Sequence, residues 1–199
     1  MNVNIPPNIT VGVLAIQGDY AKHIEQLQQL GVSHREVRLP RDLEGLSALI
    51  LPGGESTTMD KMIDRFAMRQ PLIDFCRTHA VYGTCAGMIL LCTKIKDNQS
   101  NVKPLGIIDI EVLRNGYGRQ VFSFGEELDI SFGNGKKQIE ASFIRAPKIT
   151  AIGKGIEVIG RRGDDPVLVR HGKILASSFH NELGSDQSVL KFFLTHFLG

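Results

Sequence analysis

Residues 80–91 read Ala80-Val81-Tyr82-Gly83-Thr84-Cys85-Ala86-Gly87-Met88-Ile89-Leu90-Leu91, and this stretch carries the strongest structural signal in the chain. Apolar runs before Gly83 and after Gly87 predict a strand, a sharp turn and a helix, with Cys85 at the turn. Such a turn is typical of the nucleophile elbow, which lifts a reactive side chain above a sheet and tolerates only small neighbours. The N–H groups and partial positive charge of the following helix favour the thiolate, the nucleophilic form of cysteine. The alternative interpretation is a buried structural cysteine at a βα turn.

A second pattern near the C-terminus supplies the base that a cysteine nucleophile needs. Residues 174–183 read Ile174-Leu175-Ala176-Ser177-Ser178-Phe179-His180-Asn181-Glu182-Leu183, an apolar strand candidate followed by a His-x-Glu pair. Side chains two apart in an extended segment point to the same side, so Glu182 can orient the imidazole of His180. A surface pair at a strand end is the alternative interpretation. Because Cys85 and His180 both follow predicted strands, they are expected at the edge where open α/β sheets build their sites.

The first hundred residues alternate between strand and helix patterns. Buried strands are predicted at residues 11–16 and 47–51, and a more polar strand, nearer an edge, at 32–39. Helices are predicted at residues 19–30, with Asp19 as N-cap and Gly31 as stop, at 57–69, and from Pro71 onward. This alternation indicates parallel strands joined by right-handed crossovers.

The pattern changes after about residue 104. Short strands are predicted around residues 108–113, 122–132, 139–144, 156–159 and 167–169, and the turn residues between them favour antiparallel hairpins. A closing helix is predicted at 186–198. The predicted fold class is therefore α/β, an open mixed, mainly parallel sheet flanked by helices, with an antiparallel portion in the C-terminal half. Residues 1–199 are expected to form a single domain, with residues 1–10 as a polar N-terminal extension.

The composition fits a soluble enzyme, because 42% of the 199 residues are hydrophobic and 22% are charged. A formal net charge of +2, without a long basic run, gives no electrostatic footprint for nucleic acid. Three cysteines without a CxxC pair argue against a disulfide framework or a zinc site, and Cys76 and Cys92 fall in apolar helical patterns. No signal-peptide pattern and no apolar stretch of roughly 20 residues occur, so a cytoplasmic location without membrane contact is expected.

A glycine-rich loop, Gly53-Gly54-Glu55-Ser56-Thr57, separates a predicted strand from a predicted helix. Two glycines allow the backbone to approach a ligand and to expose N–H groups. The loop is not a P-loop, since no Gly-Lys-Ser/Thr follows, but a phosphate-binding nest stays open. Ser56 or Thr57 is expected to cap the next helix. In an acyl-transfer site, this loop and the N–H of Ala86 could together stabilise an oxyanion.

These features together resemble the glutaminase subunit of pyridoxal 5'-phosphate synthase, a family of triad-type glutamine amidotransferases. The resemblance extends from about Val11 to Leu198. The stretches that carry it are Gly12-Val13-Leu14-Ala15-Ile16-Gln17-Gly18, Leu51-Pro52-Gly53-Gly54-Glu55-Ser56-Thr57-Thr58-Met59, Gly83-Thr84-Cys85-Ala86-Gly87, Arg114-Asn115-Gly116-Tyr117-Gly118-Arg119-Gln120, Phe143-Ile144-Arg145-Ala146-Pro147 and Ser178-Phe179-His180. The elbow and the His-x-Glu pair indicate the broad class, and the second, fourth and fifth stretches indicate this family.

The resemblance implies a flavodoxin-like, class I glutamine amidotransferase fold that hydrolyses L-glutamine to L-glutamate and ammonia. It implies a catalytic set of Cys85 as nucleophile with His180 and Glu182 as its relay. The glutamine pocket would be lined by Gly53, Gly54, Glu55, Arg114, Ile144 and Arg145, with Gly54 and Ala86 at the oxyanion. Arg145 or Arg114 would suit the α-carboxylate, because a planar guanidinium binds a carboxylate well.

The resemblance also implies a partner, a synthase subunit with a (β/α)₈ barrel that receives the ammonia. No cofactor and no metal are expected on this chain, since pyridoxal phosphate would be made on the partner. The family usually has His-Pro-Glu where this chain has His180-Asn181-Glu182. Two alternatives stay open. One is another α/β-fold cysteine hydrolase acting on γ-glutamyl or peptide bonds, and the other is a non-catalytic regulatory subunit.

Overall fold

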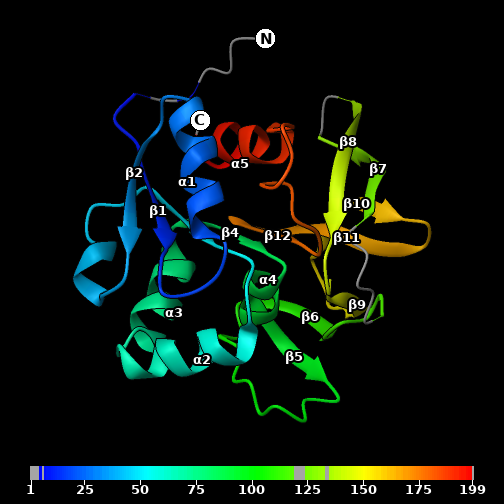
Figure 1. Ribbon diagram of the computed structural model, residues 1–199, viewed down its shortest axis with the longest axis horizontal. Coiled ribbons are helices and arrows are strands. Elements are labelled where there is room, and N and C mark those ends of the chain that lie inside the picture. Colours follow the sequence, from blue (N-terminus) through cyan, green and yellow to red (C-terminus); the bar gives the residue numbers. More distant parts are fainter. Residues whose placement is uncertain (1–4, 6, 119–123, 133–134, 199) are drawn as a thin grey trace.

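The computed structural model describes residues 5, 7–118, 124–132 and 135–198 of the chain. Five parallel strands form one half of its central sheet (Figure 1). They are β1 (Thr10–Leu14), β2 (Ser33–Val37), β3 (Ala48–Leu51), β4 (Ala80–Thr84) and β12 (Ile174–Ser177). They lie in the order β2-β1-β3-β4-β12. The most polar strand, β2, is at the edge, as its composition predicts.

Four more strands continue the same sheet in antiparallel fashion beyond β12. They are β11 (Asp165–His171), β10 (Glu157–Arg162), β7 (Phe124–Ser131) and β8 (Lys136–Phe143), in that order. Among the described residues, Gly160–Ile130 is the one ladder pair between β10 and β7, and an ion pair between Arg162 and Glu126 also joins these strands. The prediction of a mixed sheet with an antiparallel portion in the C-terminal half is confirmed.

A separate three-stranded sheet was not predicted. It consists of β5 (Cys92–Lys96), β6 (Ile108–Leu113) and β9 (Lys148–Ile152), with β5 parallel and β9 antiparallel to β6. The alternation of residues 108–113 is real, because Ile108, Ile110 and Val112 are buried. Its assignment to antiparallel hairpins is wrong, since β6 pairs in parallel with the strand that leaves the elbow helix. A period of two does not reveal which strand is the partner.

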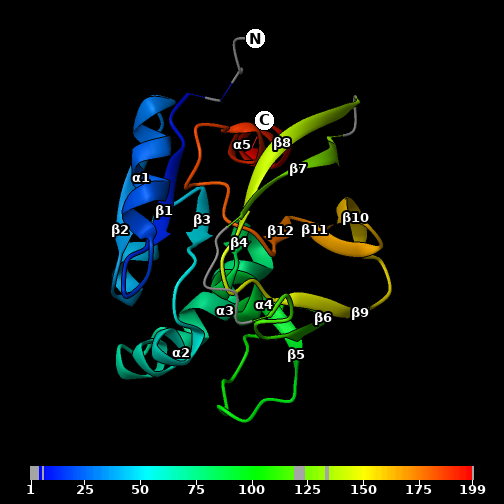
Figure 2. The same cartoon turned by 45° about the vertical axis from the view of Figure 1, so that its right-hand side comes forward.

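Helices cover both faces of the parallel half (Figure 2). They are α1 (Tyr20–Gln29), α2 (Ser56–Arg65), α3 (Arg69–Thr78), α4 (Ala86–Leu91) and α5 (Ser188–Leu198). Alternate residues of β1 face opposite layers: Val11 and Val13 pack in one apolar cluster with residues of α1 and α5, whereas Leu14 packs in another with residues of α2, α3 and α4. Helix α1 therefore lies on the opposite face of the sheet from the elbow helix.

Several predicted boundaries need correction. The two helices predicted at 57–69 and from Pro71 onward are present, but the first ends at Arg65 and the second begins at Arg69, because Ala67, with a φ of 55°, interrupts the helical backbone between α2 and α3. Neither Ser56 nor Thr57 caps α2. The N-cap is Glu55, whose carboxylate accepts the N–H groups of Thr57 and Thr58. The predicted N-cap Asp19 precedes α1 but makes no side-chain capping bond.

The two buried cysteines outside the elbow lie in different elements. Cys76 lies in α3 as predicted, while Cys92 begins β5 instead of extending a helix, and both are buried.

A 3₁₀ turn, Pro40–Leu43, joins β2 to β3. Residues 1–4 and 6 of the predicted N-terminal extension lie outside the described residues, as do Arg119 and Gln120, and Thr10 already belongs to β1. Within the ranges described, no helix has the length and apolar character to cross a bilayer.

Candidate active site

Cys85 lies where β4 ends and α4 begins, in a backbone conformation that few L-residues adopt. Its φ of 48° and ψ of −103° fit the sharp turn predicted for an elbow. The turn is crowded, since a Cβ on Gly87 would lie 2.1 Å from the carbonyl oxygen of Leu51. The N–H of Cys85 donates to Ser177 O at 2.8 Å, which joins the elbow to the end of β12. His180, the predicted base, follows three residues after Ser177.

His180 is held against both halves of the sheet and is only 4% exposed. Its backbone exchanges two hydrogen bonds with Ser142 of β8, at 2.8 and 3.2 Å. Its ring lies against Gly53, where a Cβ would come within 2.2 Å of the ring carbon Cε1. Gly53 is therefore required to be a glycine because the imidazole occupies the space of a side chain. The prediction that Gly53 belongs to the site agrees with this contact.

Glu182 lies behind His180, away from the cavity, and is 3% exposed. His180 Nδ1 and Glu182 Oε1 are 2.6 Å apart, the geometry of a short charge-assisted hydrogen bond. With Nδ1–H donating to the carboxylate, the other ring nitrogen, Nε2, faces away from Glu182. This is the orientation that the His-x-Glu spacing predicts.

The pKa of His180 shows how this arrangement holds charge. Burial disfavours the imidazolium, but hydrogen bonding and charge interactions with Cys85 and Glu182 outweigh it and raise the pKa of His180. The raised pKa lets the ring of His180 hold a proton, as a base that takes one from a cysteine nucleophile must. By contrast, burial raises the pKa of Cys76 and Cys92 to about 12, so both stay inert thiols.

A cavity of about 180 Å³ opens beside Cys85 and His180. It is lined by Asp19, Gly54, Glu55, Ser56, Cys85, Ile89, Arg114, Asn115, Ile144, Arg145 and His180. Among the predicted site residues, Glu55, Cys85, Arg114, Ile144, Arg145 and His180 line this cavity, and so does Gly54, which was also predicted at the oxyanion. The other three lie next to the cavity. Gly53 packs against the ring of His180, Ala86 is the first residue of α4, and Glu182 orients His180. The structure thus brings every predicted site residue to one place.

The glycine loop is fixed from the side by the turn after β1. Gln17 Oε1 accepts the N–H of Glu55 at 2.9 Å, and Gly53 O accepts the N–H of Asp19 at 3.1 Å. Gly54 has a φ of 158°, close to extended. Its N–H and that of Ala86, the first residue of α4, make no hydrogen bond within the described residues. Two backbone donors near Cys85 are thus available for a ligand.

Arg114 and Glu55 form the opposite wall. Arg114 Nη2 lies 3.3 Å from Glu55 Oε1 and 3.2 Å from Thr57 Oγ1. Although partial burial disfavours its charged form, Glu55 has a lowered pKa because Thr58 and Thr57 donate to its carboxylate. Glu55 is thus occupied with capping α2 and holding Arg114. The guanidinium keeps donors that are not used by any described residue.

Ile144 and Arg145 follow β8 at the mouth of the cavity. The carbonyl of Ile144 lies 3.9 Å from Cys85 Sγ, a long contact at the limit of a sulfur hydrogen bond. Arg145 has a φ of 48°, so the chain turns sharply there and presents backbone groups to the cavity. Its exposed guanidinium has no hydrogen bond or ion pair within the described part of the chain. The outer antiparallel strands therefore complete a site that begins on the parallel half.

Comparison with known proteins now adds to this geometry. The profile of the SNO glutamine amidotransferase family matches residues 13–198. This chain belongs to that family. A pyridoxal 5'-phosphate synthase subunit PdxT of Thermus thermophilus is 47% identical over 186 residues, covering 92% of this chain and 95% of the relative. The protein of the same name from Francisella philomiragia is 48% identical over 187 residues, covering 94% and 98%.

Solved structures support the SNO family assignment and the predicted fold class. A crystal structure of a glutamine amidotransferase, 46% identical, superposes with a TM-score of 0.86 over 92% of this chain and 96% of its own. A putative GMP synthase subunit from Thermoplasma acidophilum shares the fold with a TM-score of 0.67 at 16% identity, over 94% and 92% of the two chains. The resemblance to this family of glutamine amidotransferases is confirmed.

Sequence analysis missed two residues of this SNO family member that contact the site. Gln17 fixes the glycine loop, and His23 of α1 reaches Glu182 from the opposite face of the sheet, with 3.6 Å between Nε2 and Oε1. Gln17 lies in a stretch that carries the family resemblance, so its motif was a usable signal. His23 had no such signal, because a histidine on the inner face of an amphipathic helix is indistinguishable from a core residue.

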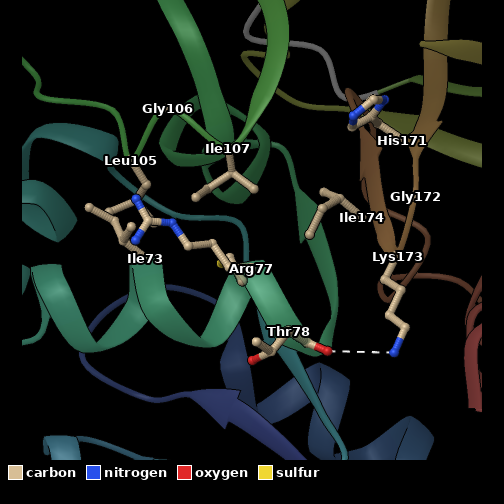
Figure 3. A pocket seen from close by; sticks show the side chains of 11 residues that line it. Ile73, Arg77, Thr78, Leu105, Gly106, Ile107, His171, Gly172, Lys173 and Ile174 are labelled. Carbon is tan, nitrogen blue, oxygen red and sulfur yellow. Dashed lines mark hydrogen bonds between the residues drawn. The ribbon is translucent and has the colours of Figure 1, made fainter. Parts of the chain in front are cut away.

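A larger cavity of about 620 Å³ lies elsewhere on the molecule (Figure 3). Its lining includes Arg77, Thr78, His171 and Lys173, and Lys173 Nζ donates to Thr78 O at 3.5 Å. Thr78 and Lys173 lie just before β4 and β12, at the amino ends of these strands, whereas Cys85 and His180 follow their carboxyl ends. The smaller cavity is therefore the candidate active site of this family member, since open α/β sheets bind ligands at the carboxyl ends of their strands.

Proposed function

We propose that this chain is a glutaminase that hydrolyses L-glutamine to L-glutamate and ammonia and supplies the ammonia for pyridoxal 5'-phosphate synthesis. The observation that carries the proposal is the strained, buried Cys85 beside the His180–Glu182 pair and a cavity lined by Arg114, with the N–H groups of Gly54 and Ala86 unbonded among the described residues. Membership of the SNO family and the names of the Thermus and Francisella relatives support the same activity.

In the first step, the thiolate of Cys85 attacks the side-chain amide carbon of glutamine. A carbon–sulfur bond forms, and the amide oxygen takes the negative charge. The N–H groups of Gly54 and Ala86 would receive this oxyanion, because charge that develops near preorganised donors is stabilised most. His180 then passes its proton to the amide nitrogen, the carbon–nitrogen bond breaks, and ammonia leaves.

In the second step, a water molecule replaces ammonia. Neutral His180 removes a proton from the water, and the resulting hydroxide attacks the thioester carbon. The carbon–sulfur bond breaks, glutamate leaves, and the thiolate–imidazolium pair is restored. Glu182 keeps Nδ1 of His180 protonated in both steps, which keeps Nε2 as the atom that gives and takes the proton.

The shape and charge of the cavity support a free amino acid as substrate. A volume of about 180 Å³ is below the roughly 300–1,000 Å³ typical of pockets for larger ligands. Arg114 is held in place by Glu55 and Thr57, and its remaining donors, unused by any described residue, suit the α-carboxylate. Peptide hydrolysis would require an open groove for the flanking residues, so the cavity favours glutamine over a peptide.

The partner would be the synthase subunit, a (β/α)₈ barrel that consumes the ammonia. The word "subunit" in the names of the Thermus and Francisella relatives supports an assembly of at least two kinds of chain. Ammonia would pass from the cavity to the barrel without release to bulk water. Pyridoxal phosphate would be formed on the barrel and need not bind this chain.

The test is ammonia and glutamate release from L-glutamine, measured with and without the synthase subunit of the same organism. Stoichiometric production of both, at an increased rate when the synthase subunit is present, is expected. Hydrolysis of γ-glutamyl peptides in preference to glutamine would support the alternative cysteine hydrolase. Absence of any hydrolysis in the complex would support the non-catalytic regulatory subunit.

A further inference from the structure

His23 is a buried titratable side chain for which the mechanism above has no use. It lies on α1 and is 1% exposed. Its Nε2 is 3.2 Å from Thr84 Oγ1 and 3.6 Å from Glu182 Oε1. The same carboxylate oxygen is 2.6 Å from His180 Nδ1. Two imidazoles, from opposite ends of the sequence, therefore converge on one oxygen atom of Glu182.

Helix α1 contacts the same loop a second time. Gln26, one turn after His23, donates from Nε2 to the carbonyl of Asn181 at 3.3 Å. Residues three apart on a helix lie on one face, so α1 presents two polar side chains to the segment 180–182. Both are buried in a helix whose other inward residue, Leu27, is apolar. Burying two polar side chains costs free energy unless they find polar partners. Gln26 hydrogen-bonds to Asn181, while His23 hydrogen-bonds to Thr84 and faces the carboxylate of Glu182.

The surroundings of His23 determine where its proton lies. Its Nδ1 is buried and has no hydrogen-bond partner within the described residues. A proton on Nδ1 would leave a buried donor unpaired and would turn the bare Nε2 lone pair toward the Glu182 carboxylate. A proton on Nε2 instead points to Thr84 and Glu182 and leaves only a weak acceptor unpaired. The Nε2–H tautomer is thus favoured.

We propose that His23 is a positioning residue, whose Nε2–H, shared with Thr84 Oγ1, faces Glu182 Oε1 at 3.6 Å and holds the carboxylate toward His180 by electrostatic attraction during glutamine hydrolysis. The proposal rests on the proposed function for its kinetic consequence, but the contact itself does not. His23 acts only through Glu182 and His180, because it does not line the cavity.

His23 is suited to this task because it is neutral. Burial lowers the pKa of His23, and the charge of His180 lowers it further. The charges of Glu182 and Asp19 raise this pKa but do not outweigh burial. Among the described residues, the other titratable group against it is Tyr82, whose ring meets the imidazole edge-on at 6.3 Å between centroids. A neutral donor orients the carboxylate without competing with imidazolium His180 for its charge.

The experiment compares three variants with the parent enzyme in complex with the synthase subunit. His23→Leu removes the donor at similar volume, and His23→Gln restores an N–H near the position of Nε2. Leu27→Val trims a buried side chain on the same helix and is the control for loosened packing. The readouts are kcat and KM for glutamine, and the pH dependence of iodoacetamide alkylation at Cys85, located by mass spectrometry.

For His23→Leu we expect kcat to fall about tenfold with little change in KM, since the loss is confined to the proton relay. The alkylation profile should move to higher pH by roughly one unit, because a less well-held Glu182 stabilises imidazolium His180 less. His23→Gln should recover most of both effects. Leu27→Val should lower the melting temperature without moving the alkylation profile.

The proposal is overturned if His23→Leu keeps the parent's kcat and profile, or if Leu27→Val moves the profile equally. If His23→Leu does not fold, nitrogen NMR of the labelled parent decides: a proton on Nε2 of His23 at pH 7 is required, and a proton on Nδ1 refutes the contact. A parent enzyme that shows this tautomer but does not hydrolyse glutamine would contradict the proposed function and leave the contact intact.

Discussion

His180 Nδ1 lies 2.6 Å from Glu182 Oε1, although the residue between them is asparagine and not the proline usual in the family. The contact does not depend on a proline because other bonds hold the loop. Ser142 fixes the backbone of His180, and Gln26 fixes the carbonyl of Asn181. The short bond is thus a consequence of tertiary contacts on both sides of residue 181.

Asn181→Pro should be tolerated and should raise the melting temperature slightly. The N–H of Asn181 donates to no described acceptor, so proline removes no backbone bond. Its side chain contributes only a 3.5 Å contact to Glu140 O and leaves Oδ1 buried without a partner among the described residues. A proline that fits the native backbone raises the free energy of unfolding by about 0.4–1 kcal/mol, because it restricts the conformations of the unfolded chain. Thermal unfolding and glutamine turnover measure this, and a loss in both would mean that the backbone here cannot accept proline.

Removing the base should cost more activity than neutralising its acceptor. His180→Ala deletes the group that moves the proton, a contribution of roughly 10²–10⁴ in rate. Glu182→Gln keeps a side chain of the same shape and leaves the imidazole in place, so its loss of kcat should be smaller. Steady-state kinetics of the two variants in the synthase complex test the order. Equal losses, or the reverse order, would give Glu182 a role beyond orienting His180.

Stability should depend on pH through Glu182. Burial opposes its charge, yet the hydrogen bond and the positive charge of His180 hold the pKa of Glu182 below its ordinary value. Below the pKa of an unfolded glutamate, near 4.3, the folded state therefore binds fewer protons than the unfolded state, and acid favours unfolding. The stabilisation is present at neutral pH and is lost as the pH falls through the folded pKa.

Denaturant melts of the parent and of Glu182→Gln from about pH 7 to about pH 3, an interval that extends below the pKa of an unfolded glutamate, check this sign. The free energy of unfolding of the parent should fall more than that of Glu182→Gln over this interval. A difference between the two proteins that is constant with pH would show that Glu182 has the same pKa folded and unfolded.

Arg114 should contribute more to glutamine binding than Arg145. The guanidinium of Arg114 is held by Glu55 and Thr57, so less side-chain freedom is lost when it binds a carboxylate. Arg145 is exposed, and its contribution is expected to come mainly from its backbone. Arg114→Ala should raise KM about tenfold or more, and Arg145→Ala should raise it less. A larger increase in KM for Arg145→Ala than for Arg114→Ala would indicate that Arg145 binds the α-carboxylate.

Local patterns were sufficient for the elements that form the reactive centre. The apolar run, small residues and cysteine at 80–91 predicted the elbow, and the observed φ of Cys85 agrees with it. The His-x-Glu spacing predicted the Nδ1 contact. In both cases the residues that interact are close in sequence or follow neighbouring strands, so pattern and topology together determine the geometry.

Long-range contacts were not predictable in the same way. Nothing near His23 indicates Glu182, because the contact spans the chain and depends on where α1 packs. The small sheet β5–β6–β9 escaped prediction for a similar reason, since alternation in residues 108–113 does not identify the partner strand. The sequence predicts Ser56 or Thr57 as the cap of α2. Glu55 caps the helix instead, because its longer side chain reaches the N–H groups of both Thr57 and Thr58.

The central claim is that Cys85 carries out glutamine hydrolysis, and Cys85→Ala tests it most directly. The variant loses only a buried sulfur atom, so its fold should persist with a modest change in melting temperature. Matched Cys76→Ala and Cys92→Ala variants also remove a buried sulfur, but away from the cavity. The measurement is ammonia release from L-glutamine by each variant in the synthase complex. If Cys85 is the nucleophile, Cys85→Ala gives only background release while the other two variants retain turnover; full turnover by Cys85→Ala would exclude this role.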